Sequence, residues 1–324
     1  MSTATQPISQ PRARAEVIQL PAPRTRGATG AGLRDLAELI KARVTTLIVL
    51  TAWTGFYFAA VKSGVDSFSL LLVHALVGIG MVAAGTAALN EAIERDIDAL
   101  MHRTAVRPLV TGTMSLQRGI LIGVGLTIGG AAYLAFACNL LTGLLALATS
   151  IAYLAAYTPL KRVHPLCTFV GAFPGAMPPV LGWAAVRGRV DFEAFVLFAI
   201  VFFWQFPHFH SIAWLYREDY SRANIRMLPV VESDGRSTVR AILLYLVALI
   251  PASTVPSLVG MSGRVYLVGA VILGLLFLWT GIRLGRAAMS PDNKDSKPLA
   301  RRVLLASVLY LPLLFALMMI NSTR

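Results

Sequence analysis

The sequence predicts an all-α, polytopic membrane protein with about nine transmembrane helices. Of its 324 residues, 56% are hydrophobic and only 14% are charged, and the mean hydropathy is +0.68. A soluble domain cannot hide so much apolar surface from water. Two further observations support this class: a series of long apolar runs, and an unequal distribution of Lys and Arg between the segments that join them.

Residues 1–33 precede the first apolar run and are rich in Pro, Ala, Thr and Arg, with no apolar period. This composition is typical of a disordered basic tail. A transit peptide is the second interpretation, but Pro11, Pro21 and Pro23 disfavour the amphipathic helix that it requires. We therefore expect a tail over residues 1–33 and one transmembrane domain over residues 34–324.

The apolar runs are mostly close to the ~20 residues that a helix needs to span a bilayer. They cover residues 45–61, 69–89, 119–137, 139–157, 166–186, 194–215, 241–261, 265–282 and 303–320. The fifth run contains Pro174, Pro178 and Pro179, and the sixth contains Pro207. We expect both helices to be broken, which is tolerated where a helix lines a cavity inside a bundle.

The charges between the runs set the orientation. With the N-terminus inside, 24 of the 29 Lys and Arg residues fall on the inner side, as the positive-inside rule requires. The five outer ones are Lys62, Arg187, Arg189, Arg264 and Arg324. The net charge of +13 then indicates a membrane surface and an anionic substrate, and no nucleic acid. The lack of an acid-poor amphipathic leader favours the bacterial cytoplasmic membrane over the alternative, the mitochondrial inner membrane.

A dense cluster of ions follows the second run. If the apolar helix continues, Asn90, Glu94 and Asp98 are four residues apart and share one face. Three oxygen-bearing side chains on one stripe form a site for a hard cation such as Mg²⁺. The alternative is a solvated helix end on which Glu91 and Arg95 form an ordinary i,i+4 pair.

Cations surround this stripe in the sequence. Arg103 and Arg107 repeat the spacing of four just downstream and could hold phosphate. The loop after the fourth run contains Tyr157, Lys161 and Arg162, a pattern that is also common in a simple interfacial anchor. The end of the sixth run and the loop after it add four more polar residues, His208, His210, Glu218 and Asp219.

All three loops lie on the inner side, so acidic and basic groups meet at one end of the bundle. Carboxylates with Mg²⁺ and a ring of Arg and Lys can bind and ionise a diphosphate. Because the bundle interior is apolar, the diphosphate should carry a lipid tail. No Ser, Cys or Lys nucleophile with a nearby base is visible, and Cys138 and Cys167 have no metal-ligand spacing. We therefore expect electrophilic transfer of an allylic group.

The motif N-x-x-x-E-x-x-x-D resembles the Asp-rich motif of the intramembrane aromatic prenyltransferase superfamily. Four segments resemble, more narrowly, the protohaem IX farnesyltransferase family. They are residues 94–109 (E-R-D-I-D-A-L-M-H-R-T-A-V-R-P-L), 157–162 (Y-T-P-L-K-R), 171–183 (G-A-F-P-G-A-M-P-P-V-L-G-W) and 204–231 (from W-Q-F-P-H-F-H to M-L-P-V-V). The likeness covers about residues 40–320. Glu94 stands where this family more often has Asp, and the second acidic motif is reduced to Glu218-Asp219. Asn224 replaces a usual Gly, but Asn tolerates the left-handed backbone.

The resemblance implies transfer of farnesyl from farnesyl diphosphate to the vinyl group of protohaem IX (haem B), giving haem O and diphosphate. It implies Mg²⁺ on Asn90, Glu94 and Asp98, with haem B as a substrate. The catalytic set is then Asn90, Glu94, Asp98, Arg103, Arg107 and Lys161. The substrate-binding set is Arg95, Tyr157, Arg162, His208, His210, Arg217, Glu218 and Asp219. We expect His208 to contact haem, with His210 second. Haem A synthase and terminal-oxidase assembly factors are the expected protein partners.

Two other functions stay open. A prenyltransferase acting on a quinone precursor or another aromatic acceptor would keep the same site. A transporter or lipid-binding protein would explain broken helices and buried polar residues. Against the latter, the ionic residues crowd one face instead of the membrane midplane.

Overall fold

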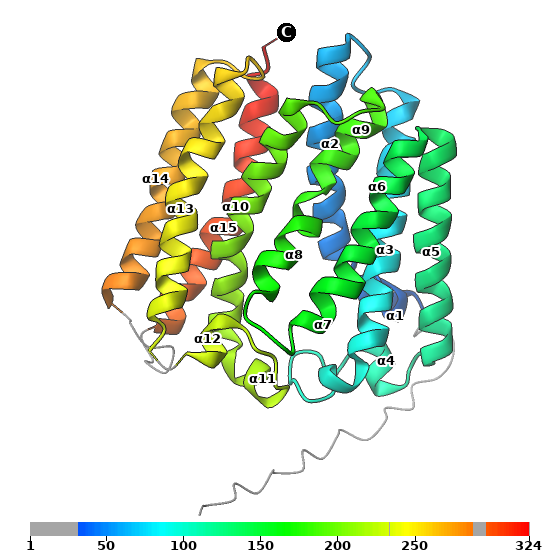
Figure 1. Cartoon of the computed structure of the whole chain (residues 1–324), viewed down its shortest axis with the longest axis vertical. Helices are drawn as coiled ribbons and strands as arrows, with labels where there is room; N and C mark the ends of the chain where they lie inside the picture. The colour runs from blue at the N-terminus through cyan, green and yellow to red at the C-terminus, as the bar shows by residue number, and fades with distance from the viewer. Residues whose placement is uncertain (1–31, 233, 288–295, 324) are drawn as a thin grey trace, which may run out of the picture.

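The computed structural model describes residues 32–232, 234–287 and 296–323 of the chain. Within these residues, nine helices are long and apolar enough to cross a membrane. They pack side by side in one bundle (Figure 1), which confirms the predicted class of multi-pass helical membrane protein. The tail expected over residues 1–33 lies outside the described residues, except that Gly32 and Leu33 belong to the first helix.

The elements follow the predicted order. They are α1 (Gly32–Leu39), α2 (Ala42–Ser63), α3 (Leu70–Asp98), α4 (Pro108–Thr111), α5 (Leu116–Ala137), α6 (Leu140–Ile151), a π-helical turn η1 (Ala152–Tyr157), α7 (Thr158–Leu160), α8 (Cys167–Ala176), α9 (Pro178–Arg187), α10 (Phe192–Leu215), α11 (Arg217–Arg222), α12 (Leu228–Val231), α13 (Arg236–Leu258), α14 (Arg264–Ala287) and α15 (Ser296–Ile320). The short helices α4, α7, α11 and α12 gather at one end of the bundle (Figure 1). Because the sequence places these segments inside, we call this the inner end.

Helix α3 extends nine residues beyond its predicted apolar run, which ended at residue 89. The added segment contains no Gly or Pro and is rich in helix formers, so nothing in it interrupts the helix. The polar stripe that follows the second run therefore lies on the same continuous helix as the run itself.

The fifth span is broken and the sixth is not. Met177 separates α8 from α9, because Pro178 and Pro179 cannot donate backbone hydrogen bonds back into α8. The predicted break in the sixth span is wrong, since α10 continues through Pro207. Polar side chains serve the backbone there: Gln205 Nε2 donates to the carbonyls of Val201 and Ala172, at 3.2 and 3.1 Å.

Helices α2 and α9 approach so closely that two glycines are required between them. A Cβ added to Gly55 would lie 1.8 Å from the carbonyl oxygen of Pro179, and one added to Gly182 would lie 1.9 Å from that of Ala52. Small residues of this kind allow membrane helices to pack backbone to backbone. This contact fixes the middle of α2 relative to the second half of the broken fifth span. A larger core packs α10 against α13, α14 and α15 around the fully buried Trp214 and Tyr266.

Candidate active site

The predicted polar stripe forms on the inner part of α3 and is buried. Asn90, Glu94 and Asp98 expose 1%, 8% and 1% of their surface. The helix continues to Asp98, so the three side chains share one face, as the spacing predicts. Ionised carboxylates in such a place require charged partners, because an unpaired buried charge is costly.

A lysine contacts each of the first two members of the stripe. Lys41 Nζ donates to Asn90 Oδ1 at 2.8 Å, and Asn90 Nδ2 donates to Thr158 Oγ1 at 3.3 Å. Lys161 Nζ lies 2.7 Å from Glu94 Oε1, and both of these side chains are nearly buried. The two lysines come from different parts of the chain, one before α2 and the other directly after α7.

An arginine completes the series. The chain leaves the helix at Asp98, and Thr104 Oγ1 donates to the Asp98 carbonyl at 2.9 Å, so the following loop folds back. Arg107 Nη1 then forms an ion pair with Asp98 Oδ2. Because this loop is not helical, the equal spacing of Arg103 and Arg107 does not place them on one helix face. Each oxygen-bearing side chain of the stripe therefore has its own cation.

Lys41 was not predicted as a site residue. Its backbone adopts the left-handed conformation (φ 48°), which is uncommon for a residue other than glycine. Burial, together with the nearby charges of Arg107 and Lys161, lowers the pKa of Lys41 to about 7. In the sequence it is one lysine ahead of an apolar run, which is typical of an interfacial anchor. No local pattern distinguishes it from such an anchor.

Glu91 was also missed as a member of the site. Its side chain is fully buried, and neither carboxylate oxygen has a hydrogen-bond partner within the described residues. The charges of Arg107 and Lys41 lie nearby. The alternative Glu91–Arg95 pair does not form, because Arg95 Nε donates to the carbonyl of Leu109 at 2.9 Å. Arg95, a predicted substrate-binding residue, instead joins α3 to α4.

The two residues of the second acidic motif have different surroundings. Asp219 is buried; its carboxylate pairs with Arg222 and accepts from the backbone N–H of Arg103 at 3.3 Å. Glu218 is exposed and pairs with Lys297 at 2.9 Å, which lowers the pKa of its carboxyl. Asp219 thus joins the inner loops after the second and sixth spans, whereas Glu218 lies away from them.

The loop after the fourth span is held in the same network. The backbone N–H of Arg226 donates to the carbonyl of Lys161 at 2.8 Å. The Lys161 ammonium lies 4.5 Å from the centre of the Tyr157 ring. Burial alone would lower the pKa of Lys161, but Tyr157, Tyr153 and Glu94 raise it above its ordinary value. Lys161 is therefore a firmly protonated cation at the centre of the inner loops.

Three predicted arginines lie around this network. Arg162 is exposed beside Lys161, and Arg217 is half-buried at the start of α11. The guanidinium of Arg103 packs 5.3 Å from the Tyr216 ring centre and lies near Tyr220. These positions agree with a basic rim, while the close contacts to the stripe come from Lys41, Arg107 and Lys161.

The two histidines of α10 lie in separate surroundings. His208 Nδ1 hydrogen-bonds to Ser307 Oγ at 2.8 Å, and its ring stacks on Trp204 with centres 4.8 Å apart. His210 is buried, and its Nδ1 donates to the carbonyl of Phe206 at 2.8 Å. Because Nδ1 of His210 is the donor, a neutral ring at this position keeps its lone pair on Nε2. No hydrogen bond joins either ring to the α3 stripe within the described residues.

The oxygen ligands of the α3 stripe suit a divalent cation only in company with other ligands. Within residues 32–232, 234–287 and 296–323, no three His, Cys, Asp or Glu side chains group so as to hold a metal ion. Mg²⁺, however, is usually bound through one or two carboxylates together with substrate phosphates and water. Glu94, Asp98 and the amide oxygen of Asn90 are hard oxygen ligands on one buried face, so they fit Mg²⁺ that arrives with a diphosphate.

Solved structures share this fold. A structure described as digeranylgeranylglyceryl phosphate synthase matches with a TM-score of 0.71 at 17% identity, covering 89% of this chain and 98% of that one. A UbiA homologue from Archaeoglobus fulgidus bound to GPP and Mg²⁺ matches with a TM-score of 0.59 at 18% identity, covering 88% of this chain and 99% of that one. At these identities the likeness concerns the fold alone.

Sequence relatives are much closer. A protoheme IX farnesyltransferase of Koribacter versatilis is 56% identical over 323 residues, covering 100% of both chains. One of Solibacter usitatus is 48% identical over 89% of this chain and 99% of its own. The model of the UbiA prenyltransferase family matches residues 48–308. With this span and these relatives, the chain belongs to the UbiA prenyltransferase family.

Proposed function

We propose that the protein transfers the farnesyl group of farnesyl diphosphate to the vinyl group of protohaem IX (haem B), forming haem O and releasing diphosphate. The observation that carries this is the buried series of three cations on the α3 stripe: Lys41 on Asn90, Lys161 on Glu94, and Arg107 on Asp98. Relatives that carry the name protoheme IX farnesyltransferase align along the chain at 56% and 48% identity. They support haem B as the acceptor.

The cations and the oxygens of the stripe have separate tasks when substrate binds. Mg²⁺ bound through Asn90, Glu94 and Asp98 would neutralise diphosphate charge and so make it a better leaving group. Lys161 and Arg107 then exchange their carboxylate partners for diphosphate oxygens. Such preorganised cations stabilise charge where it develops on the leaving group.

The reaction balances without a protein nucleophile. The bond between farnesyl C1 and oxygen breaks, and both electrons leave with diphosphate. The vinyl group supplies the electron pair for the new carbon–carbon bond, and water adds to the resulting cation and releases a proton. The protein must therefore hold two apolar substrates close together and keep the leaving group charged and bound.

An aromatic row offers an apolar surface for these substrates. Phe169 and Phe173 of α8 pack against Phe202 of α10, with ring centres 5.8 and 5.1 Å apart. Phe169 and Phe173 remain 41% and 48% exposed. Two exposed rings on α8, packed beside a half-buried ring on α10, suit contact with a farnesyl chain or a porphyrin, and aromatic faces also stabilise nearby positive charge.

The inner end is proposed to face the bacterial cytoplasm, from the positive-inside asymmetry. Haem A synthase and terminal-oxidase assembly factors are the proposed protein partners, because they would receive haem O.

The test is turnover by purified protein in detergent with farnesyl diphosphate, Mg²⁺ and a choice of acceptors, read by mass spectrometry. We expect a porphyrin that carries an added hydroxyfarnesyl group. Unchanged haem together with prenylation of a quinone precursor would overturn the acceptor and keep the site. No diphosphate release with either acceptor would overturn the enzyme itself.

A further inference from the structure

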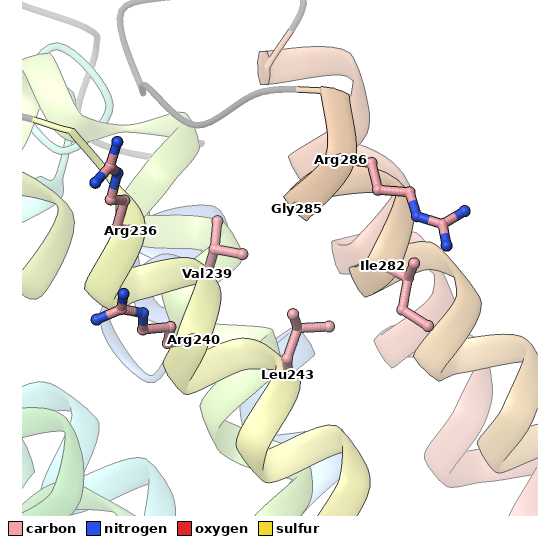
Figure 2. A pocket seen from close by; sticks show the side chains of 7 residues that line it. All are labelled: Arg236, Val239, Arg240, Leu243, Ile282, Gly285 and Arg286. Atoms are coloured by element: carbon pink, nitrogen blue, oxygen red, sulfur yellow. The ribbon is translucent and has the colours of Figure 1, made fainter.

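A pocket of about 450 Å³ lies between α13 and α14, near the ends of these helices that lie at the inner end of the bundle. Its wall contains Arg236 and Arg240 from α13 and Arg286 from α14. Figure 2 shows apolar side chains, including Leu243 and Ile282, in the gap between the two helices; the three arginines stand at its rim, with Arg236 and Arg240 pointing outward from α13 and Arg286 pointing outward from α14. None of these residues belongs to the network on α3.

The rim is strongly positive. Arg236 pairs with Asp234 at 3.2 Å, but both of these side chains are mostly exposed. Arg240 and Arg286 are exposed and have no ion pair within the described part of the chain. Both guanidinium groups point away from the gap and must turn toward it to share one anion, which their flexible stems allow. Guanidinium matches phosphate oxygens well.

On both helices, arginines at the inner end are followed by apolar side chains deeper in the membrane. On α13, residues Arg236, Arg240, Leu243 and Val247 follow one helical stripe, and on α14 the stripe is Leu275, Trp279, Ile282 and Arg286. On both stripes the end members and the arginines are exposed, whereas Leu243 and Ile282 are half-buried. The two helices run antiparallel, so the arginines of both stripes lie toward the inner end and the apolar side chains lie deeper in the membrane.

The length of this pattern matches one half of a bilayer. Eleven residues of helix rise about 16 Å, and half of the hydrocarbon core is about 15 Å. We propose that this groove binds an anionic phospholipid of the inner leaflet, with its phosphate on Arg240 and Arg286 and one acyl chain along Leu243 and Ile282. Basic pockets between membrane helices on the inner side are the usual sites for anionic headgroups.

The test uses full-length protein, delipidated in detergent and titrated with phosphatidylglycerol or with phosphatidylcholine of the same chains, with bound lipid counted by native mass spectrometry. The variant R240Q/R286Q should bind phosphatidylglycerol about 30-fold more weakly, which corresponds to about 1 kcal/mol for each arginine near a membrane surface. The control R118Q/R264Q removes two other exposed arginines, and its affinity should be unchanged.

Three results would overturn the inference. They are equal loss of phosphatidylglycerol from both double variants, equal affinity of the wild type for the two lipids, and displacement of the lipid by millimolar inorganic phosphate or by farnesyl diphosphate. The last would show a free-anion site or a second substrate site. If R240Q/R286Q does not fold, I282Q tests the apolar floor with the arginines in place, and it too should weaken phosphatidylglycerol binding.

Discussion

Replacing Lys161 with methionine should destabilise the protein strongly, although the two side chains have similar volumes. The Lys161 ammonium lies 2.7 Å from Glu94, and the two side chains are only 11% and 10% exposed. Removing one member of a buried ion pair leaves the other charge uncompensated, which costs about 3–5 kcal/mol. Replacing both members with neutral residues of similar volume removes that penalty. The double variant K161M/E94Q should therefore recover most of the stability that K161M loses.

The assay measures the free energy of unfolding of detergent-solubilised protein by titration with SDS, and turnover is measured on the same samples. Turnover should be lost in K161M and in the double variant alike, because both lack the cation for the leaving group. A double-mutant cycle gives the coupling energy directly. The reasoning is refuted if K161M is as stable as the wild type, or if K161M/E94Q is no more stable than K161M.

Three further predictions concern other parts of the chain. G182A should prevent folding, since the added Cβ would meet a backbone carbonyl of α2. G125A should fold normally, because a Cβ at Gly125 meets open space. Equal yields of the two variants as membrane-inserted protein would contradict the close contact between α2 and α9. D219N should lower turnover by disconnecting two inner loops, and E218Q should leave turnover nearly unchanged, because an exposed ion pair contributes little. Steady-state turnover of the two variants is the measurement. A larger loss in E218Q than in D219N would contradict the placement of Asp219 between the inner loops. Burial alone would raise the pKa of Asp191, but its Arg187 and Trp183 donors lower it, so the ionised carboxylate stabilises the fold above the ordinary aspartate pKa and this stabilisation is lost as pH falls. Between about pH 5 and 3, the melting temperature should therefore fall more steeply in the wild type than in D191N. Parallel curves for the two proteins would contradict this.

The fold could be predicted from the sequence because bilayer thickness fixes the length of each apolar run. The break in the fifth span could be predicted as well, since consecutive prolines cannot donate to the preceding turn. The same rule failed for α10, where Pro207 is accommodated within the helix. Proline alone does not tell whether side chains such as Gln205 will hold neighbouring carbonyls. Asn224 does adopt the left-handed backbone that its turn was expected to require.

The site could be predicted in part. Spacing alone placed Asn90, Glu94 and Asp98 on one face, because a helix repeats every 3.6 residues. Lys161 was expected in the site, but its pairing with Glu94 and the contact of Lys41 with Asn90 could not be predicted, because these lysines reach the stripe from segments 67 and 49 residues away in the chain. Such long-range contacts depend on how the helices pack, and spacing carries no information about them.

The most direct test of the account is turnover by the D98A variant with farnesyl diphosphate, Mg²⁺ and haem B. The matched control is D96A, which removes an exposed carboxylate two residues earlier on α3. We expect D96A to form the hydroxyfarnesyl porphyrin at close to the wild-type rate, and D98A to form none although it is folded and inserted in the membrane. Near-normal product formation by D98A would contradict the assignment of the α3 stripe as the active site.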